Sequence, residues 1–431
     1  MDYAAAEEQL NALSMFGIKL GLDAITRLLQ LAGSPERGLR FLHLAGSNGK
    51  GSVGAMLAAG LHHAGFQVGF FSSPHLISVR ERFRINGKAM PSTEFTELME
   101  MLAPAIATMR GEGQCPTYFE VNVALAALYF QRHRVDWAVW ETGMGGRLDA
   151  TNTITPELSI ITGISLEHQQ YLGHTLRAIA GEKAGIIKPG VPVFTGMMPD
   201  EASAVIAARA AELQAPLYRL PDAYCHPVDP VFHAADFTQE FTLGDRRLKL
   251  RLAGRVQQRN AALALQVLEY LAPLHHFSLD AAVAGMAATV WPGRLQRLPR
   301  GLILDGAHNP EGAVELAATL SDYFPGQRFN IVFGGLADKD TVGVLRALAT
   351  IARQFVFVPM EGPRPSHPPA RLAALLAQVD PVMPSSTAAD LGEAVDRVLG
   401  NGGPVLIAGS LYLAGKVLSD LLPPQRTLDI E

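Results

Sequence analysis

The sequence predicts an α/β protein that folds as two domains, and three observations carry this prediction. The chain has 431 residues, more than a single domain usually contains. Hydrophobic residues make up 48% of the chain and charged residues 18%, which is enough apolar material to fill complete hydrophobic cores. Short apolar runs alternate with longer helical stretches, a rhythm typical of a mainly parallel sheet covered by helices.

The first part of the chain contains most of the strand candidates. The apolar runs expected to form strands are residues 39–46, 67–73, 135–143, 158–165 and 190–196. Residues 52–66 and 260–273 have the pattern of helices. Residues 237–254 alternate between polar and apolar and turn at Gly244-Asp245, which predicts a β-hairpin and hence a small antiparallel element in the first domain.

A Pro- and Arg-containing stretch, "WPGRLQRLPR" at residues 291–300, has the composition of a linker. After it the α/β rhythm restarts, with strand candidates at 301–305, 329–335, 354–360 and 404–410. We therefore expect domains at 1–296 and 297–431. The Pro-rich stretch "EGPRPSHPPA", residues 361–370, reads as a loop to which the sequence assigns no role.

Charge and cysteine content exclude several classes of protein. The formal net charge of -5 does not favour nucleic acid as a partner. The two cysteines, Cys115 and Cys225, form no C-x-x-C pair, so neither a disulfide scaffold nor a cysteine zinc site is expected. The start of the chain lacks the pattern of a signal peptide, and no run of about 18 apolar residues predicts a membrane span. We expect a cytoplasmic monomer without membrane association.

The stretch "HLAGSNGKGS", residues 43–52, resembles a phosphate-binding loop with altered spacing. The usual pattern is G-x-x-x-x-G-K-[ST], but here Leu44 replaces the first glycine and the hydroxyl arrives one residue late, at Ser52. The loop lies between an expected strand and an expected helix, where backbone N–H groups can hold phosphate oxygens. Three glycines and Lys50 at this junction favour a nucleotide site over a plain turn capped by Ser52.

Glu141 is the candidate acidic partner of this loop. It ends a strand in "VDWAVWETGMGGRLDATN" and should lie at the carboxyl edge of the sheet, where ligands bind in such folds. A strand-end glutamate alone is more often a solvated loop residue. The glycines that follow it favour a metal carboxylate.

Seven motifs in order resemble one family of enzymes. They are "AGSNGKGS", "SSPHLISVRERFRING", "TYFE", "ETGMGGRLDATN", "SLEHQQYLG", "EKAGIIKPG" and "LDGAHNPEG". Together they resemble the folylpolyglutamate synthase family, in particular its bacterial members that are also dihydrofolate synthases, over nearly the whole chain. The family belongs to the Mur-ligase-like ATP-dependent amide ligases, whose phosphate loop carries a Lys-Gly-Ser or Lys-Thr-Thr variant, so the altered spacing resembles a family trait.

The resemblance implies a fold, substrates and cofactors. The fold is an N-terminal P-loop domain with a mainly parallel sheet and a C-terminal Rossmann-like α/β domain, with Mg-ATP bound between them. The reaction adds L-glutamate to dihydropteroate and to reduced folates through an acyl phosphate. Expected cofactors are ATP as co-substrate, two Mg²⁺ ions and a monovalent cation.

The resemblance also assigns roles to individual residues. The residues matched to ATP binding are Gly46, Asn48, Gly49, Lys50, Gly51, Ser52, Asn260 and Arg294. Those matched to metal binding are Ser52, Ser73, Glu141 and His168. Those matched to the pteroate pocket are Thr117, Tyr118, Phe119 and Asp149. Asp305 and His308 match positions needed for activity, while His308 and Ser410 match glutamate contacts.

Many relatives have His-Gln where this chain has Val256-Gln257, which weakens the transfer of roles at residue 256. The family's lysine matching Lys183 is carbamylated, so we expect the same here. A lysine beside two cations favours its neutral form, and a neutral amine can add CO₂ to become an anion.

Other functions stay open at this point. One is a muramyl-peptide ligase of the same superfamily, and another is a non-catalytic nucleotide switch built on the P-loop. A dinucleotide-binding C-terminal half is disfavoured, because no G-x-G-x-x-G follows a strand there. The identity of the general base also stays open between Asp305 and His308.

Overall fold

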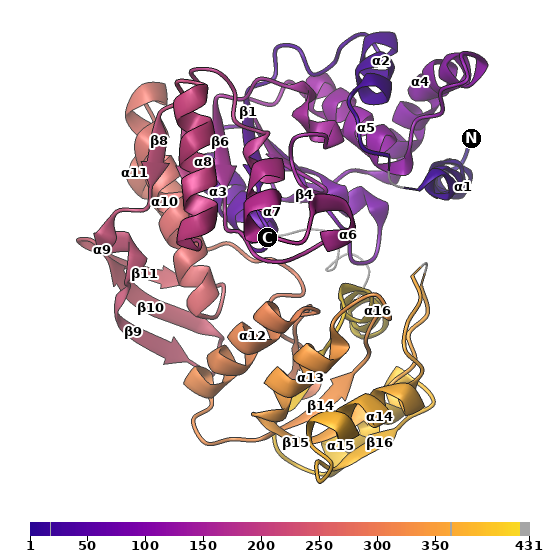
Figure 1. The fold of residues 1–431 in the computed structure, drawn as a ribbon, viewed down its shortest axis with the longest axis vertical. Coiled ribbons are helices and arrows are strands. Elements are labelled where there is room, and N and C mark those ends of the chain that lie inside the picture. The colour runs from indigo at the N-terminus through magenta and orange to yellow at the C-terminus, as the bar shows by residue number, and fades with distance from the viewer. Residues whose placement is uncertain (18, 363, 423–431) are drawn as a thin grey trace. The chain divides into compact units, whose positions relative to one another are not determined.

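The computed structural model describes residues 1–17, 19–362 and 364–422. Contacts within it divide the chain into two compact units (Figure 1). The first unit contains residues 1–226 and 259–289, and the second contains 227–258 and 290–427 as far as they are described. Of the helices in these ranges, none is long and apolar enough to cross a membrane.

The first unit is built on an eight-stranded sheet in the order β4-β3-β2-β5-β1-β6-β7-β8. The strands are β1 (Phe41–Ala45), β2 (Val68–Phe71), β3 (Phe83–Ile85), β4 (Lys88–Ala89), β5 (Trp137–Glu141), β6 (Leu158–Ile161), β7 (Val193–Thr195) and β8 (Leu217–Arg219). All neighbours pair in parallel except β2 with β3 and β3 with β4. The five strands expected from apolar runs are therefore present.

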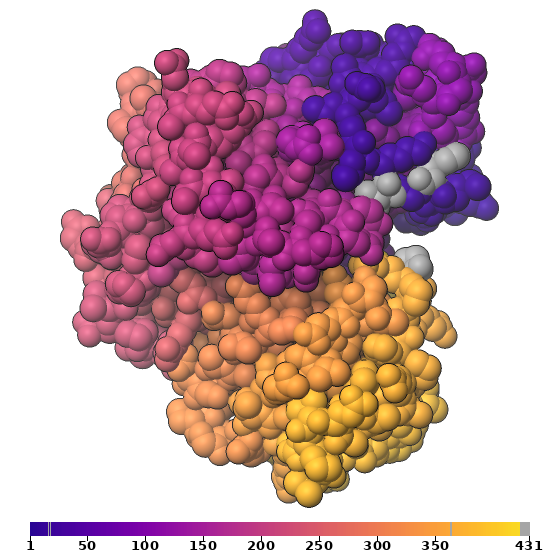
Figure 2. Space-filling view, viewed as in Figure 1, coloured from indigo at the N-terminus to yellow at the C-terminus, as the bar shows by residue number. Residues whose placement is uncertain are grey.

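Helices cover both faces of this sheet. They are α1 (Tyr3–Ala12), α2 (Asp23–Leu31), α3 (Lys50–His63), α4 (Ser92–Gly111), α5 (Tyr118–Arg132), α6 (Gln169–Leu172), α7 (Leu176–Ala184), α8 (Asp200–Glu212), α9 (Asp222–Cys225), α10 (Arg255–His275) and α11 (Leu279–Ala287). Side chains from α1, α2, α4 and α5 share a core with Phe41 and Trp140, and those of α7 and α8 share one with Ala45 and Ile161. Helix α3 covers the opposite face, where Gly54 lies against Phe70. The space-filling view of Figure 2 shows the α7 and α8 segments, in magenta, on the face of the molecule turned toward the viewer.

The second unit contains two sheets. The smaller is antiparallel in the order β11-β10-β9, formed by β9 (Val228–His233), β10 (Thr238–Leu243) and β11 (Arg246–Leu250). The larger has the order β12-β13-β17-β14-β15-β16, with β12 (Gln296–Arg297), β13 (Leu302–Leu304), β14 (Phe329–Phe333), β15 (Ala352–Phe357), β16 (Ser385–Thr387) and β17 (Val405–Ala408). Its helices are α12 (Pro310–Tyr323), α13 (Thr341–Ala349), α14 (Pro369–Val379), α15 (Leu391–Gly400) and α16 (Leu411–Leu421).

The predicted hairpin is confirmed, but it groups with the second unit and not with the first. Strands β10 and β11 pair with Leu243 opposite Arg246 around the predicted Gly244-Asp245 turn. The Tyr323 hydroxyl of α12 donates to the Thr238 carbonyl at 3.1 Å. The antiparallel element of the first sheet is instead β3 and β4 at its edge. The domain limits 1–296 and 297–431 stay a prediction about the parts that fold independently.

Candidate active site

The phosphate loop is closed by contacts that only glycine permits. Strand β1 is buried throughout, and α3 follows it with Gly49 as N-cap in the left-handed region at φ 90°. A Cβ atom on Gly46 would lie 1.9 Å from Oγ1 of Thr162, and one on Gly49 would lie 2.6 Å from Oδ1 of Asn260. Gly51 is already the second residue of α3. The loop therefore leads directly into a helix start, whose first N–H groups have no acceptor within the helix and can hold an anion.

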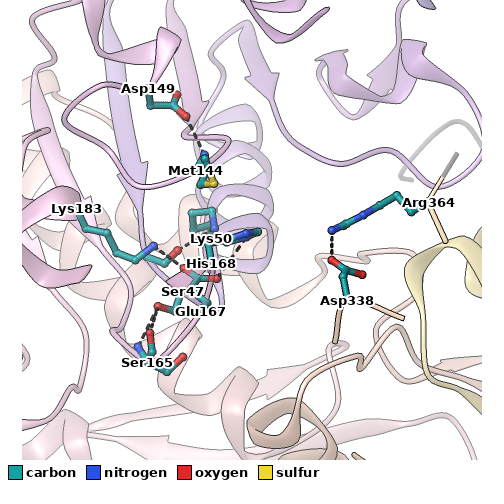
Figure 3. A network of polar contacts seen from close by, with 11 residues as sticks. Ser47, Lys50, Met144, Asp149, Ser165, Glu167, His168, Lys183, Asp338 and Arg364 are labelled. Atoms are coloured by element: carbon teal, nitrogen blue, oxygen red, sulfur yellow. Dashed lines mark hydrogen bonds and ion pairs between the residues drawn. The ribbon is translucent and has the colours of Figure 1, made fainter. Parts of the chain in front are cut away.

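Lys50 and Ser52 are held inside this loop. Nζ of Lys50 donates a hydrogen bond to the carbonyl of Gly46 at 2.8 Å, which folds the ammonium back over the loop (Figure 3). The Thr162 hydroxyl donates to the carbonyl of Asn48 at 2.6 Å and ties the loop to the end of β6. Ser52 is buried on the first turn of α3. These hydrogen bonds thus fix the conformation of the loop.

Glu141 lies beside the loop, as predicted. It is the last residue of β5 and pairs in register with Leu44 of β1, and only 3% of its surface is exposed. The backbone N–H of Ser73, just past the end of β2, donates to Oε2 of Glu141 at 3.2 Å. Ser73 and Glu141 therefore meet at the carboxyl edge of the sheet, next to the strand that leads to Ser52.

These oxygen donors fit Mg²⁺, which prefers a few carboxylate or hydroxyl oxygens together with substrate phosphates. Among the described residues, no three His, Cys, Asp or Glu side chains lie close enough to form a metal site alone. A site of the Mg²⁺ type does not need such a cluster.

A buried ion pair joins Lys183 to Glu167. Lys183 is 1% exposed, and its Nζ donates to Oε1 of Glu167 at 2.6 Å (Figure 3). Burial lowers the pKa of Lys183 to about 8, although the Glu167 charge opposes the shift. Burial would raise the pKa of Glu167, but the charges of Lys183 and Lys50 outweigh it and the net shift is downward. Nε2 of His168 lies 4.0 Å from Oε2 of the same carboxylate.

The "TYFE" stretch starts α5 through a capping box. The Thr117 hydroxyl accepts from the N–H of Glu120 at 3.2 Å, and the Glu120 carboxylate accepts from the N–H of Thr117 at 2.7 Å. The guanidinium of Arg82 lies 5.4 Å from the centre of the Tyr118 ring. Thr117 therefore has a structural role, and its role in pteroate binding stays a prediction.

The glycine-rich loop after Glu141 is braced by Asp149 and Phe119. Both Asp149 oxygens accept hydrogen bonds, one from Met144 N–H at 2.8 Å and the other from the Thr151 hydroxyl at 2.6 Å and its N–H at 3.0 Å. Burial raises the Asp149 pKa, and these hydrogen bonds oppose the shift. A Cβ atom on Gly143 would lie 2.5 Å from the Phe119 ring. Both side chains shape the loop, whatever they contribute to a ligand.

In the second unit, Asp305 and Arg294 lie at the end of β13. The carboxylate of Asp305 accepts from the N–H of Leu295 at 2.8 Å and from that of Ala307 at 2.7 Å. Burial raises the pKa of Asp305, and the positive charge of Arg294 opposes this. Asp305 thus fixes the corner that the sequence predicted, between strand β13 and helix α12.

His308 follows on the same corner and is uncharged at neutral pH. Burial lowers its pKa to about 4; its bond to the carbonyl of Gly306 opposes the shift, while the charges of Lys339, Arg294 and Arg364 add to it. Nδ1 lies 2.9 Å from that carbonyl, which can only accept, so Nδ1 carries the proton and Nε2 keeps its lone pair.

The remaining predicted residue of this unit, Ser410, caps α16. Its hydroxyl accepts from the N–H of Tyr412 at 3.1 Å, and its surface is 1% exposed. Its contact with glutamate stays a prediction.

The sequence did not predict three charged residues, one beside Lys183 in the first unit and two near His308 in the second. Glu167 lies within the motif "SLEHQQYLG" and Arg364 within the Pro-rich stretch "EGPRPSHPPA", but neither received a role, and Lys339 lies in no quoted motif. Glu167 and Arg364 pair with Lys183 and Asp338, which are distant in sequence, so no local pattern marks them. For Glu167 the adjacent His168 was a usable signal.

Comparison with known proteins identifies the family. Residues 293–411 match the family model "Mur ligase, glutamate ligase domain". The dihydrofolate synthase/folylpolyglutamate synthase of Bacillus subtilis is 36% identical over 428 residues, covering 96% of this chain and 98% of that protein. The folylpolyglutamate synthase of Lacticaseibacillus casei is 34% identical over 410 residues, covering 92% and 94%.

Solved structures agree with this likeness. The folylpolyglutamate synthase of Mycobacterium tuberculosis complexed with ADP has a TM-score of 0.88 at 30% identity and covers 98% of this chain and 99% of its own. An FPGS–AMPPCP–folate complex has a TM-score of 0.82 at 32% identity and covers 98% and 100%. The chain belongs to the dihydrofolate synthase/folylpolyglutamate synthase family of ATP-dependent glutamate ligases.

Proposed function

We propose that this protein joins L-glutamate to dihydropteroate and to reduced folates in reactions driven by ATP. The observation that carries the proposal is the phosphate loop between β1 and α3 with Glu141 at the end of the neighbouring strand. A carboxylate is a poor acyl donor, and this arrangement suits an enzyme that activates one by phosphorylation. The names of the relatives from Bacillus subtilis and Lacticaseibacillus casei supply the class of substrate.

The chemistry has two steps. A carboxylate oxygen of the pteroate or folate attacks the γ-phosphorus, the bond to the β-phosphate oxygen breaks, and ADP leaves. The amine of glutamate then attacks the acyl carbon, phosphate leaves, and the nitrogen loses a proton. Lys50 and the N–H groups at the start of α3 stabilise charge on the transferring phosphoryl group in the first step.

Ser52, Ser73 and Glu141 would hold a Mg²⁺ ion, and His168 a second. Bound there, Mg²⁺ would neutralise charge on the phosphate oxygens. Glu141 is suited to this role because its carboxylate is buried at the edge of the sheet beside the phosphate loop.

Lys183 lies beside Glu167 and close to His168, so the charge on Lys183 would affect the binding of the second ion. As an ammonium it would repel a cation, whereas a carbamate would attract one. Burial lowers the pKa of Lys183 to about 8, so its neutral amine forms more readily than that of an ordinary lysine. Its nitrogen can bond to the carbon of CO₂ and release one proton to a base. We propose that Lys183 is carbamylated in the active enzyme.

His308 and Asp305 serve the incoming amine. The Nε2 lone pair of His308 is available at neutral pH, because burial keeps the ring uncharged. Asp305 holds the corner on which His308 stands. Either group can take the proton from the amine.

On the acceptor side, Tyr118 and Phe119 supply flat apolar surface of the kind that a pterin or benzoate ring stacks on. Thr117 and Asp149 fix the start of α5 and the glycine-rich loop beside them.

The deciding experiment is mass spectrometry of the products formed from ATP, L-glutamate and either dihydropteroate or tetrahydrofolate. We expect a mass gain of one glutamyl residue on each acceptor, with release of one phosphate per bond. Phosphate release only with UDP-muramyl substrates would indicate a muramyl-peptide ligase. Slow hydrolysis that no carboxylic acid stimulates would indicate a nucleotide switch.

A further inference from the structure

The Pro-rich loop between β15 and α14, for which no role is predicted from sequence, is hydrogen-bonded to the connection that follows β14. This loop comprises residues 358–362 and 364–368 of the described chain. The carbonyl of Pro365 accepts from the N–H of Ala337 at 2.9 Å, and the N–H of His367 donates to the carbonyl of Gly335 at 3.0 Å. An isolated antiparallel bridge joins Leu336 to Ser366. Backbone hydrogen bonds to the connection after β14 therefore hold the loop in place.

The loop lies at the ligand-binding edge of its sheet. Strands β13, β17, β14 and β15 are consecutive neighbours and parallel, so the segments that follow them gather at one edge. The N–H of Gly409, just past β17, donates to the carbonyl of Ala307 at 3.1 Å. A Cβ atom on Gly362 would lie 3.6 Å from the ring of Tyr412. The Pro-rich loop thus reaches the segment that contains Ser410.

The start of α12 borders the connection after β14 as well. A Cβ atom on Gly343 of α13 would lie 2.7 Å from Cγ of Pro310. Pro310 follows His308 by two residues, and Gly343 follows Lys339 by four. Two basic side chains from different strand connections, Lys339 and Arg364, accordingly border the corner that carries His308.

Arg364 is paired with an aspartate that a ligand can replace. Its guanidinium forms an ion pair with Asp338 (Figure 3), and both side chains are 42% exposed. An ion pair this exposed contributes little stability, because water solvates both partners. A carboxylate arriving from solution can form two parallel hydrogen bonds with the same guanidinium.

We propose that Arg364 is a specificity-determining residue that binds the side-chain carboxylate of the incoming glutamate. The inference rests on the proposed function. The amine must react near His308 after β13, so the α-carboxylate lies one carbon from that point. The side-chain carboxylate lies three carbons from the amine, two further than the α-carboxylate. Arg364 follows β15, the strand of the four farthest from β13 in the sheet order, so it meets the more remote charge.

The test compares Arg364→Met with Arg300→Met. Arg300 also pairs with an aspartate of the second unit, Asp396 at 2.9 Å, but it precedes β13 and so lies at the opposite edge of the sheet. We expect Arg364→Met to raise KM for glutamate about tenfold or more, the effect of losing a charge-assisted hydrogen bond. The KM for ATP and kcat at saturating glutamate should stay close to wild type, and Arg300→Met should match wild type throughout.

The ratio of kcat/KM for glutamate over glutamine gives a second readout that a merely structural role would not move. Glutamine lacks the side-chain charge, so Arg364→Met should lower this ratio about tenfold or more. Arg364→Lys keeps the charge but loses the paired hydrogen bonds, and it should fall between wild type and Arg364→Met. An unchanged KM and ratio in an active Arg364→Met enzyme would overturn the inference. A wild-type protein that forms no glutamyl product would instead refute the proposed function.

Discussion

At the scale of single residues, Lys50 supplies charge to the site and contributes little to the fold. The residue is half-buried, and its ammonium donates a hydrogen bond to the loop carbonyl of Gly46. We expect Lys50→Ala to lower kcat about 10²-fold or more, the usual effect of removing a donor to developing negative charge. Thermal unfolding, measured alongside turnover, should stay close to that of the wild type. Near-wild-type turnover would show that the loop does not serve phosphoryl transfer.

His43 couples stability to pH through its burial. It is fully buried in β1, and its Nε2 lies 3.0 Å from Oγ1 of Thr151, which in turn donates to Asp149. Burial and the nearby charge of Lys188 lower the pKa of His43 to about 3. The unfolded chain therefore binds a proton at His43 at a higher pH than the folded chain. The stability that His43 confers is present above its unfolded pKa of about 6.5 and is lost as the pH falls toward 3.

We therefore predict a specific difference between wild type and His43→Gln. From pH 7 to pH 5 the wild type should lose about 2 kcal/mol more of its free energy of unfolding than the variant does. Denaturant titrations at the two pH values measure this. His62→Gln, at an exposed position on α3, is the control and should follow the wild type. Equal losses in wild type and His43→Gln would mean that His43 is protonated in the folded chain.

At the scale of elements, α3 and α11 approach so closely that glycine is required between them. A Cβ atom on Gly285 of α11 would lie 2.5 Å from the carbonyl of Ala59 and 2.6 Å from Cγ of His63, both on α3. A Cβ atom on Gly60 of α3 would lie 2.9 Å from the carbonyl of Ala282. Backbone atoms cannot yield as a flexible side chain can. The close packing of α11 against α3 therefore fixes the position of α3, whose first turn forms the end of the phosphate loop.

We predict that Gly285→Ala lowers the free energy of unfolding by about 1–3 kcal/mol, because the helices must separate. The matched control is Gly181→Ala in α7, where a Cβ atom meets nothing within 4 Å. There the same substitution should raise stability by up to about 1 kcal/mol, since alanine favours helix. Denaturant unfolding of both variants makes the comparison. A neutral Gly285→Ala would show that the two helices can move apart freely.

Strands with an apolar run can be predicted from the sequence, whereas short polar strands at the edge of a sheet cannot. Apolar runs identified β1, β2, β5, β6 and β7, and all four strands expected after residue 300 are present as β13, β14, β15 and β17. Strands β4 and β16 carry no such run: Lys88–Ala89 and Ser385–Thr387 are short, polar edge strands that complete a sheet formed by others. Edge strands gain their hydrogen bonds from tertiary contact, so local composition does not reveal them.

Some positions of the candidate site can be predicted from sequence and others cannot. The glycine loop and Glu141 each follow directly from the end of a strand, so their positions could be predicted, while their roles stay predictions. The partners of Lys183 and Arg364 could not, because Glu167 and Asp338 meet them across 16 and 26 residues of chain. Asp338 and Arg364 follow β14 and β15, so their pairing depends on these strands being neighbours, and strand order is set by packing rather than by local pattern. Glu167 and Lys183 lie in the one connection between β6 and β7 and meet because α7 packs against the segment after β6.

At the scale of the whole molecule, the chain crosses from one unit to the other and back. Residues 227–258 leave the first unit, and residues 259–289 return to it. A sequence read in order shows a composition change only at the last crossing, near residues 291–300, and so predicts one boundary. Helix α10 spans the change at residues 258–259 without any break in its helical pattern, so nothing there marks a boundary.

This division predicts the behaviour of the fragment 1–296. The fragment contains every described residue of the first unit, so it should fold and show an ATP-dependent rise in its unfolding temperature. Its β9–β11 sheet lacks α12, and Tyr323 no longer bonds to Thr238 or stacks on Phe237. A small antiparallel sheet without a partner surface is marginally stable. Amide hydrogen exchange should therefore be fast in β10 and slow in β1 and β5, whereas the full chain under the same conditions should protect all three strands. Equal protection of β10 in the fragment and the full chain would show that this sheet is stable with the first unit alone, and would support a single boundary between residues 296 and 297.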